Sequence, residues 1–245
     1  MSADVWQTLP KSYILPLNTV HVWRAELSCS PNILASYSQT LSPDEQERAA
    51  RFRFETDRTR YIAARGILRQ LLADYLHTEP QRLAFDANAF GKPLLTSEFD
   101  SSLQFNLSHS GGIGLFAFAR NRRVGVDVEL CRPNLDFTAL ADSVFSPQER
   151  HFLRLMPADY RAPAFFACWT RKEAYIKAQG QGMALALDSF DVSLTPGQPR
   201  ILATRPDASE AKRWTIHDLA PGFGCAAALV VEGENCALEL RSYWH

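Results

Sequence analysis

The sequence lacks the features that mark membrane-spanning, exported and nucleic-acid-binding proteins. No apolar run in its 245 residues approaches the ~18 that a membrane-spanning helix needs. The opening segment MSADVWQTLPK has no basic start leading into an apolar stretch, so a signal peptide is not expected. The formal net charge of −1 gives no overall attraction to nucleic acid or to an anionic membrane. We therefore expect a cytoplasmic protein with neither of these partners.

Cysteine is scarce and irregularly spaced. The five cysteines are odd in number, and no two form a Cys-x-x-Cys pair. A disulfide framework uses an even number and a zinc site uses paired spacings, so neither is expected. We predict reduced, mostly buried thiols, as in a cytoplasmic protein. The residues are Cys29, Cys131, Cys168, Cys225 and Cys236.

The segment GVDVE, residues 125–129, carries the clearest functional signal. Successive side chains of a strand point to opposite faces, so Asp127 and Glu129 share one face and the valines share the other. Strand rise puts the two backbone positions about 6–7 Å apart. Alone, such an alternation is most often a solvated strand face.

The segment WTRKEAYIK, which begins at Trp169, adds a third carboxylate and a lysine. In a helix, Trp169, Glu173 and Lys177 lie on one face. If this helix packs beside the strand, Glu173 and Lys177 converge with Asp127 and Glu129. Carboxylates suit Mg²⁺, which leaves room for substrate phosphates, and a lysine suits those phosphates. The two segments together predict chemistry on a phosphate ester or anhydride.

The order of predicted elements indicates a loose duplication. A Ser-Pro-x-Glu capping box opens a helix at Ser42 and again at Ser146. A longer helix follows in each half, predicted at 56–77 and at 163–178, the second beginning at its proline and ending at Gly180. Strands are predicted at 21–27, 103–107, 113–119, 189–194, 214–219 and 225–231.

Two stretches share a rhythm of strand, glycine-containing loop and strand. They start at Leu103 and Trp214, and the first contains the expected loop SHSGG. A turn at 121–123 is predicted to make a hairpin of the strands on either side. We therefore predict an α+β fold of two similar halves, residues 1–120 and 121–245, related by a pseudo-twofold axis. The active site would lie in the cleft between them, and one chain would act as a monomer.

Several segments in this order resemble the 4'-phosphopantetheinyl transferase superfamily, in particular its surfactin-synthetase-activating type. The resemblance covers roughly residues 40–195. The segments are DRTRYIAARGILR from Asp57, GKP from Gly91, FNLSHSGG from Phe105, GVDVE from Gly125, FSPQE from Phe145 and WTRKEAYIKAQGQG from Trp169.

The resemblance implies transfer of 4'-phosphopantetheine from coenzyme A to a serine of an apo acyl, aryl or peptidyl carrier protein, releasing 3',5'-ADP. It implies Mg²⁺ as the cofactor, held by Asp127, Glu129 and Glu173. Glu173 and Lys177 would be the catalytic residues, with the Lys177 ammonium on the pyrophosphate. Further residues implied to bind coenzyme A are Arg51, Arg60, Lys92, Pro93, Ser108 and His109.

Several alternatives stay open at this point. The base that deprotonates the serine is either Glu173 or Glu149, and Lys172 would meet the same substrate or the partner. Mg²⁺ or Mn²⁺, the carrier type and the use of acyl-coenzyme A are undetermined. The arginine that contacts the 3'-phosphate is one of Arg48, Arg51 and Arg53.

Two other functions are compatible with parts of the sequence. A Mg²⁺-dependent phosphohydrolase would cleave coenzyme A or a nucleotide without a protein acceptor. A non-enzymatic module for RNA or carrier proteins would use the seven arginines between Arg48 and Arg69. That run is otherwise typical of a solvated helix face.

Overall fold

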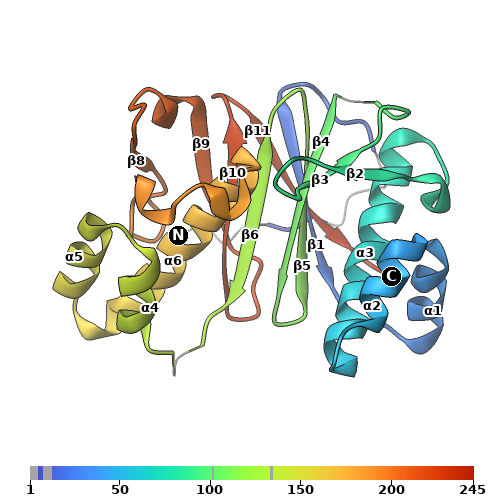
Figure 1. Cartoon of the computed structure of the whole chain (residues 1–245), viewed down its shortest axis with the longest axis horizontal. Coiled ribbons are helices and arrows are strands. Elements are labelled where there is room, and N and C mark those ends of the chain that lie inside the picture. The colour runs from blue at the N-terminus through green and yellow to red at the C-terminus, as the bar shows by residue number, and fades with distance from the viewer. Residues whose placement is uncertain (1–4, 8–12, 101, 133–134) are drawn as a thin grey trace.

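Two β-sheets form the centre of the molecule, and α-helices cover the outer side of each (Figure 1). The structure is a computed structural model that describes residues 5–7, 13–100, 102–132 and 135–245. Apolar side chains from the inner faces of both sheets form one core, and each sheet forms a further core with its own helices. The fold is α+β, as predicted.

The chain runs through the same series of elements twice. The first half contains β1 (Thr19–Glu26), α1 (Pro31–Thr40), α2 (Pro43–Ala50), α3 (Glu55–Leu76), β2 (Phe85–Ala87), β3 (Pro93–Leu95), β4 (Leu103–Ser110) and β5 (Ile113–Arg120). The second half contains β6 (Val124–Leu130), α4 (Phe137–Val144), α5 (Pro147–Leu155), α6 (Ala158–Gln179), β7 (Phe190–Val192), β8 (Ile201–Thr204), β9 (Trp214–Leu219) and β10 (Cys225–Glu232). The predicted duplication is therefore confirmed.

The two sheets repeat one strand order, β1–β5–β4 in the first and β6–β10–β9 in the second. A last strand, β11 (Ala237–Tyr243), returns to the first sheet and pairs in parallel with β1, with Thr19 opposite Ala237. Residues 237–243 thus pack with the first half. The division into 1–120 and 121–245 stays a prediction.

Strand β6 is buried on both faces. Its valines point into the core between the sheets, as the alternation predicts. Helix α6 covers the other face and approaches closely because Gly125 has no side chain, since a Cβ there would overlap Ala174 O and Ala178 N. Asp127 is consequently only 3% exposed. The alternative of a solvated strand face is excluded.

Side chains, rather than a backbone ladder, join β4 of the first sheet to β6 of the second. Three alternate residues of β4 accept a hydrogen bond from a backbone N–H of β6: Asn106 from Val126 at 2.8 Å, Ser108 from Val128 at 3.4 Å and Ser110 from Leu130 at 3.1 Å. We call this set the side-chain ladder. It places the polar face of β4 directly against the carboxylate-bearing strand.

Two strand predictions were wrong. Residues 121–123 do turn the chain, with Asn121 at φ 53°, but β5 pairs with β1 and β4 whereas β6 pairs with β10. The SHSGG segment is mostly strand, because β4 continues through Ser110 and only Gly111 and Gly112 form the turn. The polar residues were misread as a loop because the partner that satisfies them lies in the other sheet.

Helix α6 begins earlier than predicted. It starts at Ala158, so Pro163 lies inside the helix rather than in its first turn. Asp159 in the first turn is a helix-start signal that the prediction passed over. The end is as predicted, with Gly180 in the left-handed conformation at φ 72°.

All five cysteines are free, as predicted, but only Cys168 is buried. The prediction of mostly buried thiols was therefore wrong. Within the described residues, no helix is both long and apolar enough to cross a membrane.

Candidate functional site

The site is built around an ion pair between β6 and α6. Lys177 Nζ donates to Asp127 Oδ1 at 2.6 Å and to Ser108 Oγ at 2.9 Å. Ser108 Oγ in turn donates to Asp127 Oδ1 at 2.8 Å. Three elements, β4, β6 and α6, thus meet at one carboxylate oxygen.

The second oxygen of this carboxylate has no partner. Asp127 Oδ2 is buried without a hydrogen bond among the described residues. Burial raises the pKa of Asp127, opposed by Lys177 and Ser108 and reinforced by Glu129. A buried carboxylate oxygen that lacks a donor favours a bound cation.

Glu129 is held by residues that the sequence analysis did not assign. Ser110 Oγ donates to Glu129 Oε2 at 3.0 Å, and Trp169 Nε1 donates to Glu129 Oε1 at 3.5 Å. The missed signal was the alternation of polar residues at 106, 108 and 110, which matches the spacing of the carboxylates on β6. These contacts fix Glu129 on the side of β6 that faces α6.

Glu173 completes the carboxylate group. Burial raises the pKa of Glu173, and the negative charges of Asp127 and Glu129 raise it further. The three predicted metal ligands therefore share one electrostatic neighbourhood. As the side chains stand, however, no group of three or more His, Cys, Asp and Glu residues in the described ranges is arranged to hold a metal ion. The oxygen donors fit Mg²⁺ chemically, and its binding stays a prediction.

A cavity of about 530 Å³ adjoins this cluster and has walls from both halves. Lys92 and Pro93 line it from the first half, and Glu173 and Lys177 line it from α6. The remaining lining residues are Phe90, Gly91, Asn106, Ile176, Gly180, Gly182, Leu185, Ala186 and Leu187. The cleft predicted between the halves is present at this position.

Arg60 and His109 form a second group of phosphate-ligand candidates on the first half. His109 lies on β4 next to Ser108, but on the opposite face by strand alternation. Desolvation lowers the pKa of His109, and nearby Lys177 and Arg60 lower it further. The Arg60 guanidinium also lies beside Gly112, where a Cβ would be 3.6 Å from Nη2. His109 is therefore within electrostatic reach of both Lys177 and Arg60.

The remaining predicted phosphate ligand is paired with a neighbouring carboxylate. Arg51 follows α2, is mostly exposed and pairs with Glu47 at 2.5 Å. Arg48 stacks over Tyr61 and Arg53 over Phe54. Arg65 and Arg69 form ion pairs with the buried carboxylate of Glu45. Much of the basic run is thus paired or stacked locally.

Glu149 is buried in an ion pair and does not line the cavity, so the structure favours Glu173 over Glu149 as the general base. Its carboxylate is 1% exposed and pairs with Lys172 Nζ at 2.8 Å. It also accepts from the backbone N–H groups of Ser146 and Val192. Lys172 is fully buried and donates to Phe190 O as well, so it does not meet the substrate or the partner either.

Comparison with known proteins identifies the family. Residues 123–228 match the 4'-phosphopantetheinyl transferase superfamily, and residues 26–120 match the 4'-phosphopantetheinyl transferase N-terminal family. The 4'-phosphopantetheinyl transferase HetI of Nostoc is 40% identical over 246 residues, covering all of both chains. A putative 4'-phosphopantetheinyl transferase of Synechocystis is 32% identical over 75% of this chain and 74% of its own. The 4'-phosphopantetheinyl transferase Sfp of Bacillus subtilis is 29% identical over 76% and 80%.

The chain therefore belongs to the 4'-phosphopantetheinyl transferase superfamily. It is an enzyme of that transferase class, as its motifs predicted. The alternative of a non-enzymatic binding module is set aside. A solved structure, the holo-[acyl-carrier-protein] synthase of Thermotoga maritima, aligns with 45% of this chain and 62% of its own at 21% identity and a TM-score of 0.36, too partial a likeness to add to this assignment.

Proposed function

We propose that this enzyme transfers the 4'-phosphopantetheine moiety of coenzyme A to a serine of an apo acyl, aryl or peptidyl carrier protein, requires Mg²⁺ and releases 3',5'-ADP. The supporting observation is the buried, unpartnered Asp127 Oδ2, with Lys177 on the other oxygen and a cavity of about 530 Å³ alongside. The free cysteines support the further proposal of a cytoplasmic enzyme. The single chain that walls both sides of the cavity supports a monomer.

Each side chain of the cluster has a proposed role. Asp127, Glu129 and Glu173 would hold Mg²⁺, which when bound neutralises the pyrophosphate and stabilises the leaving phosphate. Lys177 faces the cavity and either neutralises charge on the pyrophosphate or protonates the leaving oxygen. Glu173 lines the cavity beside Lys177, which suits it to accept the proton of the attacking serine.

The nucleotide end of coenzyme A needs cations and hydrogen-bond donors. We assign the 3'-phosphate to His109 and Arg60, which lie together on the first half. The Ser108 hydroxyl is hydrogen-bonded to Asp127 and Lys177. Because Ser108 precedes His109 on β4, it connects the phosphate subsite to the carboxylate cluster. Lys92 and Pro93 line the cavity where the adenine would lie. Arg51 joins the subsite only if its pair with Glu47 opens.

Intact-mass analysis of an apo acyl carrier protein tests this proposal. The protein is incubated with the enzyme, coenzyme A and Mg²⁺, and we expect a gain of one phosphopantetheine. Addition of EDTA, or an acceptor with alanine at the target serine, should abolish the gain. Cleavage of coenzyme A without any gain on acyl, aryl and peptidyl carriers would instead establish the phosphohydrolase. Absence of both gain and cleavage would overturn the proposal.

A further inference from the structure

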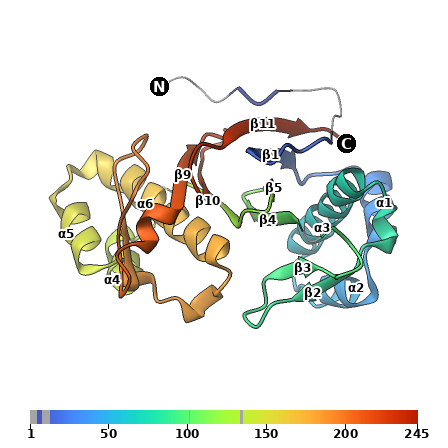
Figure 2. The same cartoon turned by 90° about the horizontal axis from the view of Figure 1, so that it is seen from above.

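Two side chains of the first half reach across to the end of α6. Lys92 Nζ donates to Lys177 O at 2.7 Å and to Val124 O at 3.2 Å. Asn88 Nδ2 donates to Gly180 O at 2.7 Å. Figure 2 shows the loop between β2 and β3, which carries both residues, beside the chain that leaves α6. Backbone carbonyls of the proposed catalytic helix are thus bound by the other half of the molecule.

The end of a helix requires such partners. The last four carbonyl oxygens of a helix accept no hydrogen bond from within the helix, and the helix dipole makes this end negative. The Lys177 and Gly180 carbonyls both belong to this region of α6. A lysine ammonium meets both requirements at once, as donor and as positive charge. Burial and the charge of Arg123 lower the pKa of Lys92 to about 8, as expected for an ammonium withdrawn from water.

Hydrogen bonds within the loop between β2 and β3 hold Asn88 in place for this contact. Asn88 Oδ1 accepts from the backbone N–H groups of Phe90 and Lys92, both at 2.9 Å. The Asn88 side chain therefore fixes the turn through its oxygen and binds Gly180 O through its nitrogen. Gly180 allows the approach, since a Cβ there would lie 3.2 Å from both Asn88 Nδ2 and Lys92 Cδ. We call Asn88 and Lys92 with their three carbonyl contacts the helix-end clasp.

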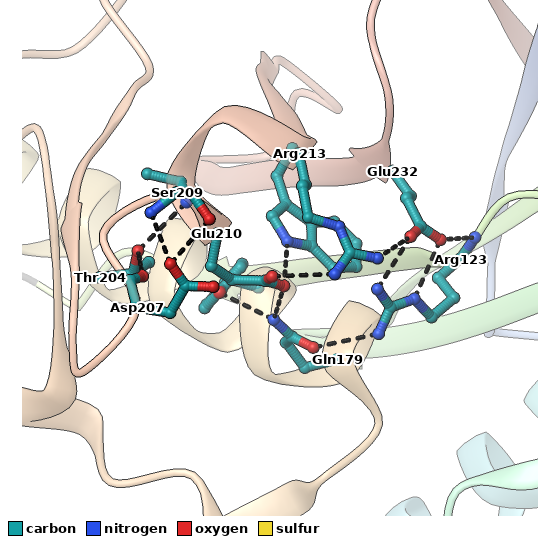
Figure 3. Close-up of polar contacts among 11 residues, drawn as sticks. Arg123, Gln179, Thr204, Asp207, Ser209, Glu210, Arg213 and Glu232 are labelled. Carbon is teal, nitrogen blue, oxygen red and sulfur yellow. Dashed lines mark hydrogen bonds and ion pairs between the residues drawn. The ribbon is translucent and has the colours of Figure 1, made fainter.

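The same turn is also held by residues of the second half. Arg123 Nη1 donates to Gln179 Oε1 at 3.1 Å, and Gln179 Nε2 donates to Glu210 Oε1 at 2.8 Å (Figure 3). Arg123 is anchored in turn, because its Nε and Nη2 donate to the Glu232 carboxylate, both at 2.9 Å. The last turn of α6 is therefore held between a network of its own half and the clasp of the other half.

We propose that Lys92 and Asn88 are positioning residues, which hold the last turn of α6 against the first half and so set the place of the Lys177 ammonium. The resemblance implied contact of Lys92 with coenzyme A. In the structure Lys92 lines the cavity, while its ammonium donates to the carbonyls of the clasp. The inference rests on the proposed role of Lys177 in transfer.

Amide hydrogen exchange of the ligand-free enzyme tests the clasp without reference to activity. Lys92→Met keeps the stem and removes the ammonium. We expect exchange at residues 177–181 to rise about tenfold, because charge-assisted hydrogen bonds are strong, with no change at 164–170. Lys92→Arg, which keeps donors, should stay near wild type. Lys212→Met, at the exposed lysine of the second half, is the matched control. Unchanged exchange in Lys92→Met would overturn the clasp.

Kinetics and nucleotide binding test the positioning. For Lys92→Met we expect kcat for transfer to fall about tenfold, with the KM for coenzyme A within about threefold, because Lys177 is displaced in the transition state. The affinity for 3',5'-ADP should also stay within about threefold. Loss of 3',5'-ADP affinity with normal exchange would make Lys92 a phosphate ligand instead. Raised exchange with unchanged kcat would show that Lys92 only caps the end of α6, and would refute its positioning role. Failure of the wild type to transfer would refute the proposed function, while the exchange result would still decide the clasp.

Discussion

Lys177 Nζ lies 2.6 Å from Asp127 Oδ1, which joins the last turns of α6 to the middle of β6. The ammonium holds one carboxylate oxygen, and the other is buried without a partner in the described structure. This asymmetry separates two tasks within a single side chain. One oxygen orients the lysine that faces the cavity, and the other is left for a cation.

Replacement of this carboxylate tests the cluster directly. Asp127→Asn keeps the shape of a side chain that is 3% exposed and removes its charge. We expect transfer to fall at least ~100-fold, since a charge-stabilising group in an active site contributes that much. The midpoint of thermal unfolding should hardly change, because a buried charge is also removed. A large drop in the midpoint of thermal unfolding with turnover retained would contradict the assignment.

Ser110 is expected to act through Glu129. Ser110→Ala removes the hydroxyl that donates to Glu129 Oε2. Because partners that orient a metal ligand typically affect metal affinity by about 10–100-fold, half-maximal transfer should need correspondingly more Mg²⁺. The measurement is a Mg²⁺ titration of the transfer rate. Ser143→Ala on α4, where the hydroxyl donates only to Leu140 O, is the control. Equal Mg²⁺ dependence of the two variants would exclude this role.

The buried pair of Lys172 and Glu149 is expected to stabilise the fold without entering the reaction. Lys172→Met leaves the Glu149 carboxylate buried and uncompensated, which costs about 3–5 kcal/mol of unfolding free energy. Urea denaturation measures this loss. Adding Glu149→Gln should recover part of it, since both charges are then gone. Lost transfer at full stability in Glu149→Gln would return this residue to the list of bases.

Acid should weaken the network around Glu232. Hydrogen bonding to Arg123 lowers the pKa of Glu232 from 4.5 to about 2. A carboxyl with a depressed folded-state pKa stabilises the protein above its unfolded pKa and loses this contribution as pH falls. The stability difference between wild type and Glu232→Gln should therefore be full above about pH 4.5 and vanish toward about pH 2. Chemical denaturation across this range measures it, and a constant difference would contradict the prediction.

Gly125 is expected to tolerate no side chain. In Gly125→Ala the new Cβ would meet the backbone of α6 at Ala174 and Ala178, which cannot move aside independently. We expect a loss of about 3 kcal/mol in the free energy of unfolding, from overpacking. Gly224→Ala is the comparison, because nothing lies within 4 Å and only its φ of 70° opposes alanine, at about 1–2 kcal/mol. Similar losses in the two variants would show that α6 can shift.

Local chemistry let the sequence determine much of this protein. Both capping boxes form as predicted, at Ser42 with Glu45 and at Ser146 with Glu149, because their groups lie within one helical turn. The strand alternation of GVDVE and the end of α6 at Gly180 are local in the same way. The order of these elements, repeated along the chain, was enough to predict two similar halves.

Only the tertiary structure decided what those local groups do. Glu149 and Glu173 look alike in sequence, yet one is paired inside the second half and the other faces the cavity, because packing sets their surroundings. The alternation of polar residues that includes Ser110 does not say which strand it faces, and Asn88 carries no signal of its own. Their partners, Glu129 and Gly180, come from the other half of the chain. Hydrogen bonds between distant segments depend on how two sheets and a helix are placed together, which neither periodicity nor capping encodes.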